Sequence, residues 1–237
     1  MKKIYLLLIV TILQLSSYSQ NGIISYSKQI FFPKLKTMDK NQNEYMKNKI
    51  SESLNKLEYI LQFNNLESVF EINKNLDLDN PFAKLASSLS GGKGVYYTNK
   101  NEKGYLHQIE TYGNLFLIRY DNINWQISNE TKKIGKYLCY KATTIKTIKS
   151  IKTYKKVVTA WYCPELPYSF GPIGYGGLPG LILELKIEKG ATFTVKKIKL
   201  NNLKKLNIKK PSKGKTITEN QYIDIGRDMY NKRKEGF

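Results

Sequence analysis

Few side chains in this sequence of 237 residues are suited to catalysis. The one histidine, His107, lies between Leu106 and Gln108 in a strand-like stretch. No Gly-x-Ser-x-Gly motif accompanies it, so we expect no serine-hydrolase triad. One histidine and two cysteines at unsuitable spacing do not supply the ligands of a zinc site. The sequence therefore predicts no metal and no cofactor.

Carboxylates are the remaining candidates for acid–base chemistry. Glu165 lies between two prolines in a segment rich in proline and glycine, and Glu184 follows that segment. A paired-acid hydrolase needs two carboxyl groups roughly 5–10 Å apart. Glu184 falls on the polar face of a predicted strand, where a salt bridge to a lysine is the simpler interpretation, and Glu165 could cap a turn. We expect no enzymatic activity, and a carboxylate-based hydrolase using Glu165 is the alternative.

The chain is organised around the segment from Trp161 to Leu185, WYCPELPYSFGPIGYGGLPGLILEL. Proline fixes φ, and glycine reaches backbone conformations that are closed to other residues. So dense an alternation of the two predicts an ordered loop with one required shape, docked against a sheet. The loop leads into a strand and lacks the Gly-Lys-Ser/Thr sequence of a P-loop, so we do not interpret it as a nucleotide site.

Within this loop, residues 177–182 read GLPGLI, which resembles the defining motif of the GLPGLI family of Bacteroidota. The lead-in from Trp161 to Pro172, Trp-Tyr-x-Pro-Glu-x-Pro-x-x-x-Gly-Pro, is also similar to that family. The resemblance brings no reaction with it, because the family has no established biochemical activity. The family's genes often lie beside those for TonB-dependent outer-membrane receptors, so the resemblance implies such a receptor, or another envelope protein, as partner.

Two hypotheses describe the aromatic and apolar side chains of the loop. They could pack as a plug at one end of the sheet, or they could line the mouth of a cavity that binds a lipid or another apolar ligand. A preformed loop lowers the ordering cost of binding, which favours the second hypothesis. We therefore predict a periplasmic or envelope binding or accessory protein. The candidate binding residues are Trp161, Glu165, Tyr168, Phe170, Tyr175, Leu178 and Pro179.

Two strands before the loop carry the cysteines. Residues 140–148 and 154–162 are strand-like, and folding them about their connection pairs residues of similar size and polarity. The same register places Cys139 opposite Cys163, so we predict a structural disulfide in an oxidising compartment. The resemblance points the other way, because relatives in the family usually keep the first cysteine and carry threonine at the position of Cys163.

Residues 1–19 have the pattern of a secretory signal peptide. Two lysines precede a twelve-residue apolar stretch, and serines at positions 17 and 19 fit cleavage before Gln20. The stretch is shorter than the ~20 apolar residues of a membrane helix. No cysteine follows it for lipid attachment, so there is no lipobox. We expect one β-rich domain from residue 20 to 237, without a transmembrane helix, in the periplasm or secreted.

The composition is strongly basic, with 39 Lys and Arg against 19 Asp and Glu and a net charge of +20. Only Arg119, Arg227 and Arg233 are arginines, whereas readers of nucleic-acid sequence favour arginine for bidentate contacts. We therefore predict no nucleic-acid binding. Attraction to an acidic envelope surface is a better match to the lysines, and a solvated lysine-rich face is simpler still. A basic C-terminal tail is expected, with a helix starting at Thr218 or Glu219.

Alternating apolar residues at short spacing predict a mainly β fold with minor α. The expected architecture is an antiparallel meander that forms an open or half-closed barrel packed on one or two helices. An amphipathic helix is expected between Asn41 and Leu57, and a long loop from Asn73 to Gly94. The alternation of apolar and polar residues shifts by one position after Val195, which predicts a β-bulge nearby. The predicted strands are 24–32, 59–63, 66–72, 95–98, 105–111, 115–120, 123–127, 140–148, 154–162, 181–187 and 192–195.

Overall fold

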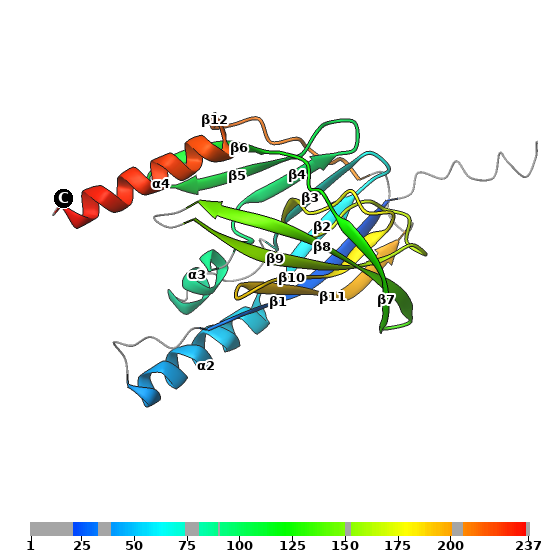
Figure 1. Ribbon diagram of the computed structural model, residues 1–237, viewed down its shortest axis with the longest axis horizontal. Helices are drawn as coiled ribbons and strands as arrows, with labels where there is room; N and C mark the ends of the chain where they lie inside the picture. Colours follow the sequence, from blue (N-terminus) through cyan, green and yellow to red (C-terminus); the bar gives the residue numbers. More distant parts are fainter. Residues whose placement is uncertain are drawn as a thin grey trace, which may run out of the picture.

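The computed structural model describes residues 21–32, 39–73, 81–89, 91–149, 153–200 and 206–235. The predicted signal peptide lies outside these residues. Within these residues, twelve strands form one curved sheet in the order β12-β6-β5-β4-β3-β2-β1-β11-β10-β9-β8-β7, which does not close into a barrel (Figure 1). This confirms the predicted class, mainly β with minor α and an open sheet.

Neighbouring strands are antiparallel except β12, which runs parallel to β6. The middle of the sheet is β1, which pairs with both β2 and β11, so the N-terminal strand joins the two halves. The strands are β1 Gly22–Ile30, β2 Tyr59–Phe63, β3 Glu67–Ile72, β4 Val95–Asn99, β5 Tyr105–Thr111, β6 Asn114–Tyr120, β7 Gln126–Ile134, β8 Tyr137–Lys149, β9 Thr153–Cys163, β10 Leu181–Ile187, β11 Ala191–Leu200 and β12 Lys215–Thr218.

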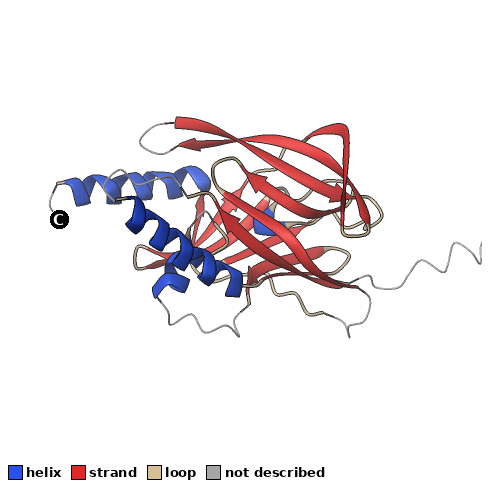
Figure 2. Ribbon diagram, turned by 90° about the horizontal axis from the view of Figure 1, so that it is seen from below, coloured by secondary structure: helices blue, strands red, loops and turns tan. Residues whose placement is uncertain are grey.

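The described helices are α2 Lys40–Lys56, α3 Pro81–Ser88, α4 Glu219–Lys234 and the single 3-10 turn η2 Pro172–Gly174. Both longer helices, α2 and the C-terminal helix α4, were expected from the sequence, and the structure shows that each begins at a capping box. The three α-helices gather at one end of the molecule, and η2 lies within the curve of the sheet (Figure 2). None of these helices has the length and apolar character needed to cross a membrane.

The predicted long loop from Asn73 to Gly94 is wrong in its middle, because Pro81–Ser88 forms α3. Proline suits the first turn of a helix, where its missing N–H would have no intrahelical partner. The helix buries Ala83 and Ala86. Eight residues are too few for a clear amphipathic period, so the helix depends on packing against the rest of the fold.

Lys28 on β1 ties α3 to the sheet from inside the protein. Its side chain is 1% exposed, and its ammonium nitrogen lies 5.5 Å and 5.9 Å from the ring centres of Tyr59 and Phe193. The same nitrogen donates hydrogen bonds to three backbone carbonyls in and just beyond α3, those of Ala86, Leu89 and Gly91. Burial lowers the pKa of Lys28 from its ordinary value of 10.5 to about 7.

This lysine makes the stability of the fold depend on pH. Between pH 7 and 10.5 the unfolded chain binds a proton that the folded chain does not, so the free energy of unfolding should rise with pH, by up to ~1.4 kcal/mol per unit. The variant Lys28→Met has a similar shape and no charge, so it should lack this rise. Urea unfolding of both proteins at pH 7 and 9 measures the difference. Equal pH dependence in the two proteins would contradict the prediction.

The segment between β6 and β7 departs from the predicted meander. A strand was expected at residues 123–127, but β7 begins at Gln126 and pairs with β8 at the far end of the sheet. The reason lies in Trp125, whose indole N–H donates to the carbonyl of Gly176 at 2.8 Å and whose ring contacts Tyr175. Residues 121–125 are therefore held against the Pro/Gly-rich loop and cross from one end of the sheet to the other.

Two β-bulges adjust the strands beside the loop. The register of β1 against β11 passes from Lys197 to Val195, so Lys196 is the extra residue, and the bulge predicted after Val195 is confirmed. A second bulge lies between β9 and β10, where the register skips Leu183. At that bulge Ile182 and Leu183 are both fully buried, because the inserted residue breaks the strict alternation of faces.

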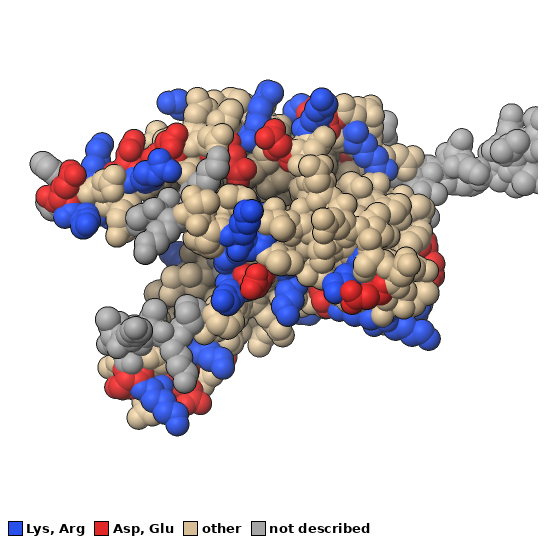
Figure 3. Space-filling model, viewed as in Figure 1, with Lys and Arg blue, Asp and Glu red and all other residues tan. Residues whose placement is uncertain are grey.

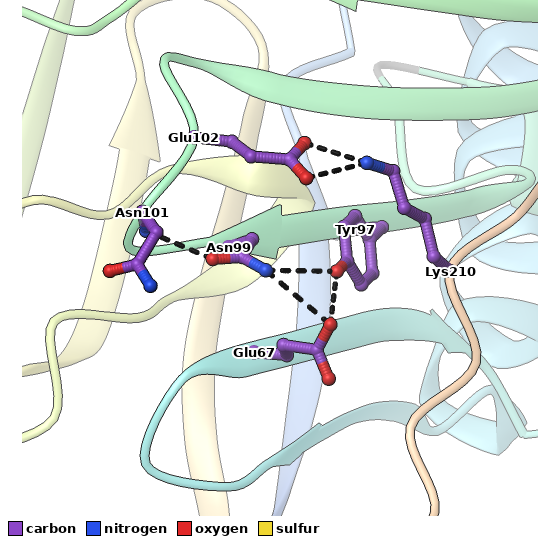
Figure 4. A network of polar contacts seen from close by, with 6 residues as sticks. All are labelled: Glu67, Tyr97, Asn99, Asn101, Glu102 and Lys210. Carbon is purple, nitrogen blue, oxygen red and sulfur yellow. Dashed lines mark hydrogen bonds and ion pairs between the residues drawn. The ribbon is translucent and has the colours of Figure 1, made fainter.

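Residues 206–214 cross the outer face of the sheet and lead into β12. Ile208 packs on a small cluster containing Tyr97. The ammonium group of Lys210 donates to both carboxylate oxygens of Glu102, at 2.6 and 2.8 Å, and the Tyr97 hydroxyl donates to Glu67 (Figure 4). Burial raises the pKa of Tyr97 to about 12, so its hydroxyl remains a donor. These contacts fix β12 beside β6 and thereby place the start of α4.

Candidate functional site

The Pro/Gly-rich loop is ordered and hydrogen-bonded to itself and to the strand that follows it. The backbone N–H of Gly177 donates to Ser169 at 2.9 Å, that of Leu181 to Leu166 at 2.8 Å, and that of Ile182 to Phe170 at 3.0 Å. The hydroxyl of Tyr26 from the central strand donates to the Ile182 carbonyl at 2.7 Å. The loop is thus a docked part of the fold.

The turn η2 carries the loop into the curve of the sheet. Gly174 has φ +80°, and a Cβ atom there would lie 2.4 Å from Cδ2 of Tyr105. Glycine is therefore required both for the left-handed backbone and for the close approach of the Tyr105 ring. Ile173 before it is buried and also has a positive φ, of 48°. This turn fixes where the next residue, Tyr175, enters the interior.

Three of the predicted binding residues are core residues of the loop. Tyr168, Phe170 and Leu178 are 4%, 1% and 1% exposed. The rings of Tyr168 and Phe170 lie 4.5 Å and 5.9 Å from that of Phe63 on β2. This burial is the arrangement that the plug hypothesis describes. Phe170 also forms part of the wall of a side cleft of about 460 Å³ beside residues 121–124.

The other predicted residues around the loop lie outside the interior, apart from Tyr175. Glu165 and Pro179 are exposed. Trp161 is partly buried, and the ammonium group of Lys132 lies 4.6 Å from its ring centre. Lys132 also forms a 2.7 Å salt bridge with Glu184, as the salt-bridge interpretation of that carboxylate predicts. Neither Glu184 nor Glu165 lines the side cleft or the two cavities described next.

Tyr175 lines a partly open chamber of about 250 Å³ between the loop and strands β4, β5, β6, β8, β9, β10 and β11. Two stacked pairs form its aromatic wall. Tyr96 stacks on His107 at 3.9 Å between ring centres, and Tyr105 stacks on Tyr120 at 4.5 Å. Further residues that line the chamber are Gly91, Lys146, Ile148, Lys156, Ile173, Ile187, Gly190 and Ala191.

A larger cleft of about 650 Å³ adjoins this chamber. It lies at the seam of the open sheet, which we define as the gap between residues 119–124 on one side and 144–147 on the other. The start of α4 covers one side of the seam with residues 218–220 and Ile223. Four residues line both the cleft and the chamber: Tyr105, Tyr120, Lys146 and Tyr175.

Burial controls the charge states in the chamber. It lowers the pKa of His107 to about 4, so this histidine is neutral at pH 7, and its Nε2 atom lies 2.8 Å from the carbonyl oxygen of Lys93. Burial raises the pKa of Tyr96, Tyr105 and Tyr175, so these phenols stay protonated. It also lowers the pKa of Lys146, which Glu219 opposes. The chamber thus presents neutral aromatic rings and lysine ammonium groups.

Sequence reasoning found Tyr175 and missed the rest of the chamber. The signal was present in the alternation of β5, where Tyr105 and His107 share one face. Their partners Tyr120 and Tyr96 become visible only through the observed registers, Tyr105 opposite Tyr120 and Tyr96 opposite His107. Lys146 comes from a distant strand, so its approach to these rings depends on the curvature of the whole sheet.

The predicted disulfide is wrong in this structure, where Cys139 and Cys163 are both free and buried. The register predicted for the hairpin is correct from Tyr140 opposite Tyr162 onwards. The cysteines lie just beyond that pairing, and Cys163 is paired with Leu181 of β10. Burial raises the pKa of the Cys139 thiol to about 12, so it is protonated at neutral pH. No cluster of metal-binding side chains occurs among the described residues.

Comparisons with known proteins support a family resemblance and a fold. A family model described as a protein of unknown function, Porph_ging, matches residues 125–156 and 149–184. The match covers the β8–β9 hairpin and most of the loop. It is consistent with the resemblance of residues 177–182 to the GLPGLI family. No curated protein matches the chain.

Solved structures of PNGF-II in space groups C2 and P21 have similar folds, with TM-scores of 0.53 and 0.52. They are 16% and 17% identical to this chain and cover 87% of it. The chain spans about a third of the length of those proteins, 32% and 33%. At this identity the likeness shows a shared fold and does not extend to activity.

Proposed function

We propose that this chain is a GLPGLI-type binding protein of the bacterial envelope that holds an apolar ligand in the chamber beneath the Trp161–Leu185 loop. The observation that carries the proposal is the position of Tyr175, which lines both the chamber and the seam cleft. The family match supports the assignment because it includes the loop. A periplasmic or secreted location and an envelope partner, such as a TonB-dependent receptor, belong to the same proposal.

The chamber suits binding because its walls are already in place. The glycine and proline turns and the hydrogen bonds of the loop fix Tyr175 before a ligand enters, so little ordering is required on binding. Ile148, Ile173 and Ile187 give it an apolar lining. A pocket of this kind, mostly apolar with a few polar groups, is the usual form of a small-molecule site.

The hydrolase alternative has less support. Glu165 is exposed in the turn after β9 and lines neither the chamber nor the seam cleft. The carboxylates that line the cleft are Asp121 and Glu219. Exposed faces of Glu165 and Pro179 are instead available for contact with a partner protein, which agrees with an accessory role.

The affinity of a neutral fluorescent probe, N-phenyl-1-naphthylamine, measures apolar binding in the chamber without a contribution from ligand charge. We expect saturable binding at one site, and a loss of affinity of about tenfold or more in Tyr175→Ala, because the probe loses an aromatic wall. Ile148→Trp should also weaken binding by filling the chamber. Tyr45→Ala, on the exposed side of α2, is the matched control.

Circular dichroism and thermal unfolding establish which variants are folded. Ile148 is only partly buried, so we expect Ile148→Trp to fold. This variant therefore tests the chamber even if Tyr175→Ala does not fold. Absence of saturable probe binding to the unmodified protein would overturn the proposal. Unchanged affinity in folded Tyr175→Ala and Ile148→Trp would do the same.

A further inference from the structure

The charged side chains that line the chamber are both lysines. Lys146 and Lys156 line it, and no residue among its described lining is a carboxylate. His107 is neutral at pH 7 because its pKa is about 4. The ammonium group of Lys156 already donates to the carbonyl of Lys189 at 3.1 Å. Lys146 is therefore the cation available where the chamber opens into the seam cleft.

Lys146 occupies a distinctive place in the seam. It projects from β8, and its ammonium nitrogen lies 5.4 Å from the ring centre of Tyr120 on β6. The nearest oxygen of Glu219, at the start of α4, is 4.0 Å away. That separation is too long for a direct hydrogen bond, so Glu219 compensates the charge without satisfying the ammonium donors. An anion entering from the cleft would reach those donors directly.

The surroundings of Lys146 strengthen its interaction with such an anion. A charge-assisted hydrogen bond strengthens when water is excluded, and Lys146 is partly withdrawn from solvent by Tyr120 and Tyr175. Elsewhere on the visible surface, lysine and arginine side chains are interspersed with acidic ones (Figure 3). The lining of the chamber thus carries lysines and aromatic rings without a carboxylate, and the nearest acidic groups, Asp121 and Glu219, line the adjoining cleft.

We propose that the ligand is a carboxylate amphiphile, with its carboxylate bound by Lys146 at the seam and its apolar body in the chamber. This rests on the proposed function, because it requires the chamber to be the binding site. The ammonium group of a lysine has three N–H donors, and a carboxylate only accepts hydrogen bonds, so one lysine can bind one carboxylate. The chamber, at about 250 Å³, is close to the lower limit of ~300 Å³ for small-molecule sites, so the head of the ligand extends into the cleft.

Displacement of N-phenyl-1-naphthylamine by three matched compounds tests this at pH 7.5. Decanoate, decanol and decylammonium share one alkyl chain and differ in the charge of the head. We expect decanoate to displace the probe about tenfold or more better than decanol, and decylammonium to be the weakest. In Lys146→Met the preference for decanoate over decanol should disappear, with both competitors compared against the affinity of the same variant for the neutral probe.

Control variants separate this lysine from lysine charge in general. Lys141→Met, on the same strand but ion-paired with Glu130 at the surface, should keep the preference for decanoate. Lys146→Arg keeps the positive charge and should keep most of the preference for decanoate, which shows whether the loss in Lys146→Met comes from the charge or from another change in the site. Equal displacement by decanoate and decanol, or a preference that survives Lys146→Met, would overturn the proposal. Failure of the neutral probe to bind would instead overturn the proposed function.

Discussion

Gly180→Ala should leave almost no folded protein. A Cβ atom at position 180 would lie 2.2 Å from the carbonyl oxygen of Cys163 and 2.5 Å from its carbonyl carbon. These are backbone atoms, and they cannot move aside because Cys163 is paired with Leu181 and its carbonyl accepts from Leu166. We expect destabilisation of more than ~4 kcal/mol, which exceeds an ordinary core overpacking.

Gly177→Ala is the matched control, in the same motif and with the same added methyl group. Gly177 has φ +81°, and a Cβ atom there meets nothing within 4 Å. Its cost should be only the left-handed backbone strain of an alanine, ~1 kcal/mol. Thermal unfolding of the two purified variants, followed by circular dichroism, measures the contrast. Equal melting temperatures would show that the loop can shift, which contradicts the tight packing of Gly180.

Phe170→Ala should destabilise the protein by ~3–5 kcal/mol, the usual cost of truncating a buried phenylalanine. The Phe170 side chain is 1% exposed, and its ring lies 5.9 Å from Phe63 and 5.1 Å from the ammonium group of Lys100. Its backbone carbonyl also accepts from Ile182, so a cavity at this position loosens the attachment of the loop.

The same measurement on Glu165→Gln is the control, since Glu165 is an exposed residue of the same loop and should change stability by less than ~0.5 kcal/mol. Urea unfolding at pH 7.5 gives both free energies. The plug hypothesis predicts the large loss for Phe170→Ala. A folded Phe170→Ala protein of unchanged stability that has lost probe binding would support the alternative, in which this ring lines the mouth of the cavity.

Local patterns predicted the elements well where the chain pairs with its neighbours in sequence. The helix at Lys40–Lys56, the hairpin of β2 and β3, and the register of β8 against β9 all follow from periodicity or cross-strand matching. The errors occur where contacts with residues far away in the sequence determine the local conformation. Residues 121–125 are attached to Gly176, and α3 depends on Lys28, so neither could be read from local alternation.

The candidate site was only partly accessible from the sequence for the same reason. The Pro/Gly-rich loop is recognisable, because its composition demands one conformation, and it supplies Tyr175. The opposing wall comes from Tyr105, Tyr120 and Lys146, on strands whose neighbourhood depends on the order of the sheet. The central place of β1 and the parallel β12 both involve residues far apart in the chain, which no short pattern specifies.

The open sheet has a consequence for how the width of the chamber can vary among proteins of this fold. In a closed barrel the bore follows from strand number and stagger, so its width changes only when the backbone is rebuilt. Here the gap between β6 and β8 is spanned by side chains, including Lys146, and by the covalent crossing of residues 121–125. Substitutions at these few positions can change the width of the gap, and so the size of molecule that fits, without altering the pairing of any strand.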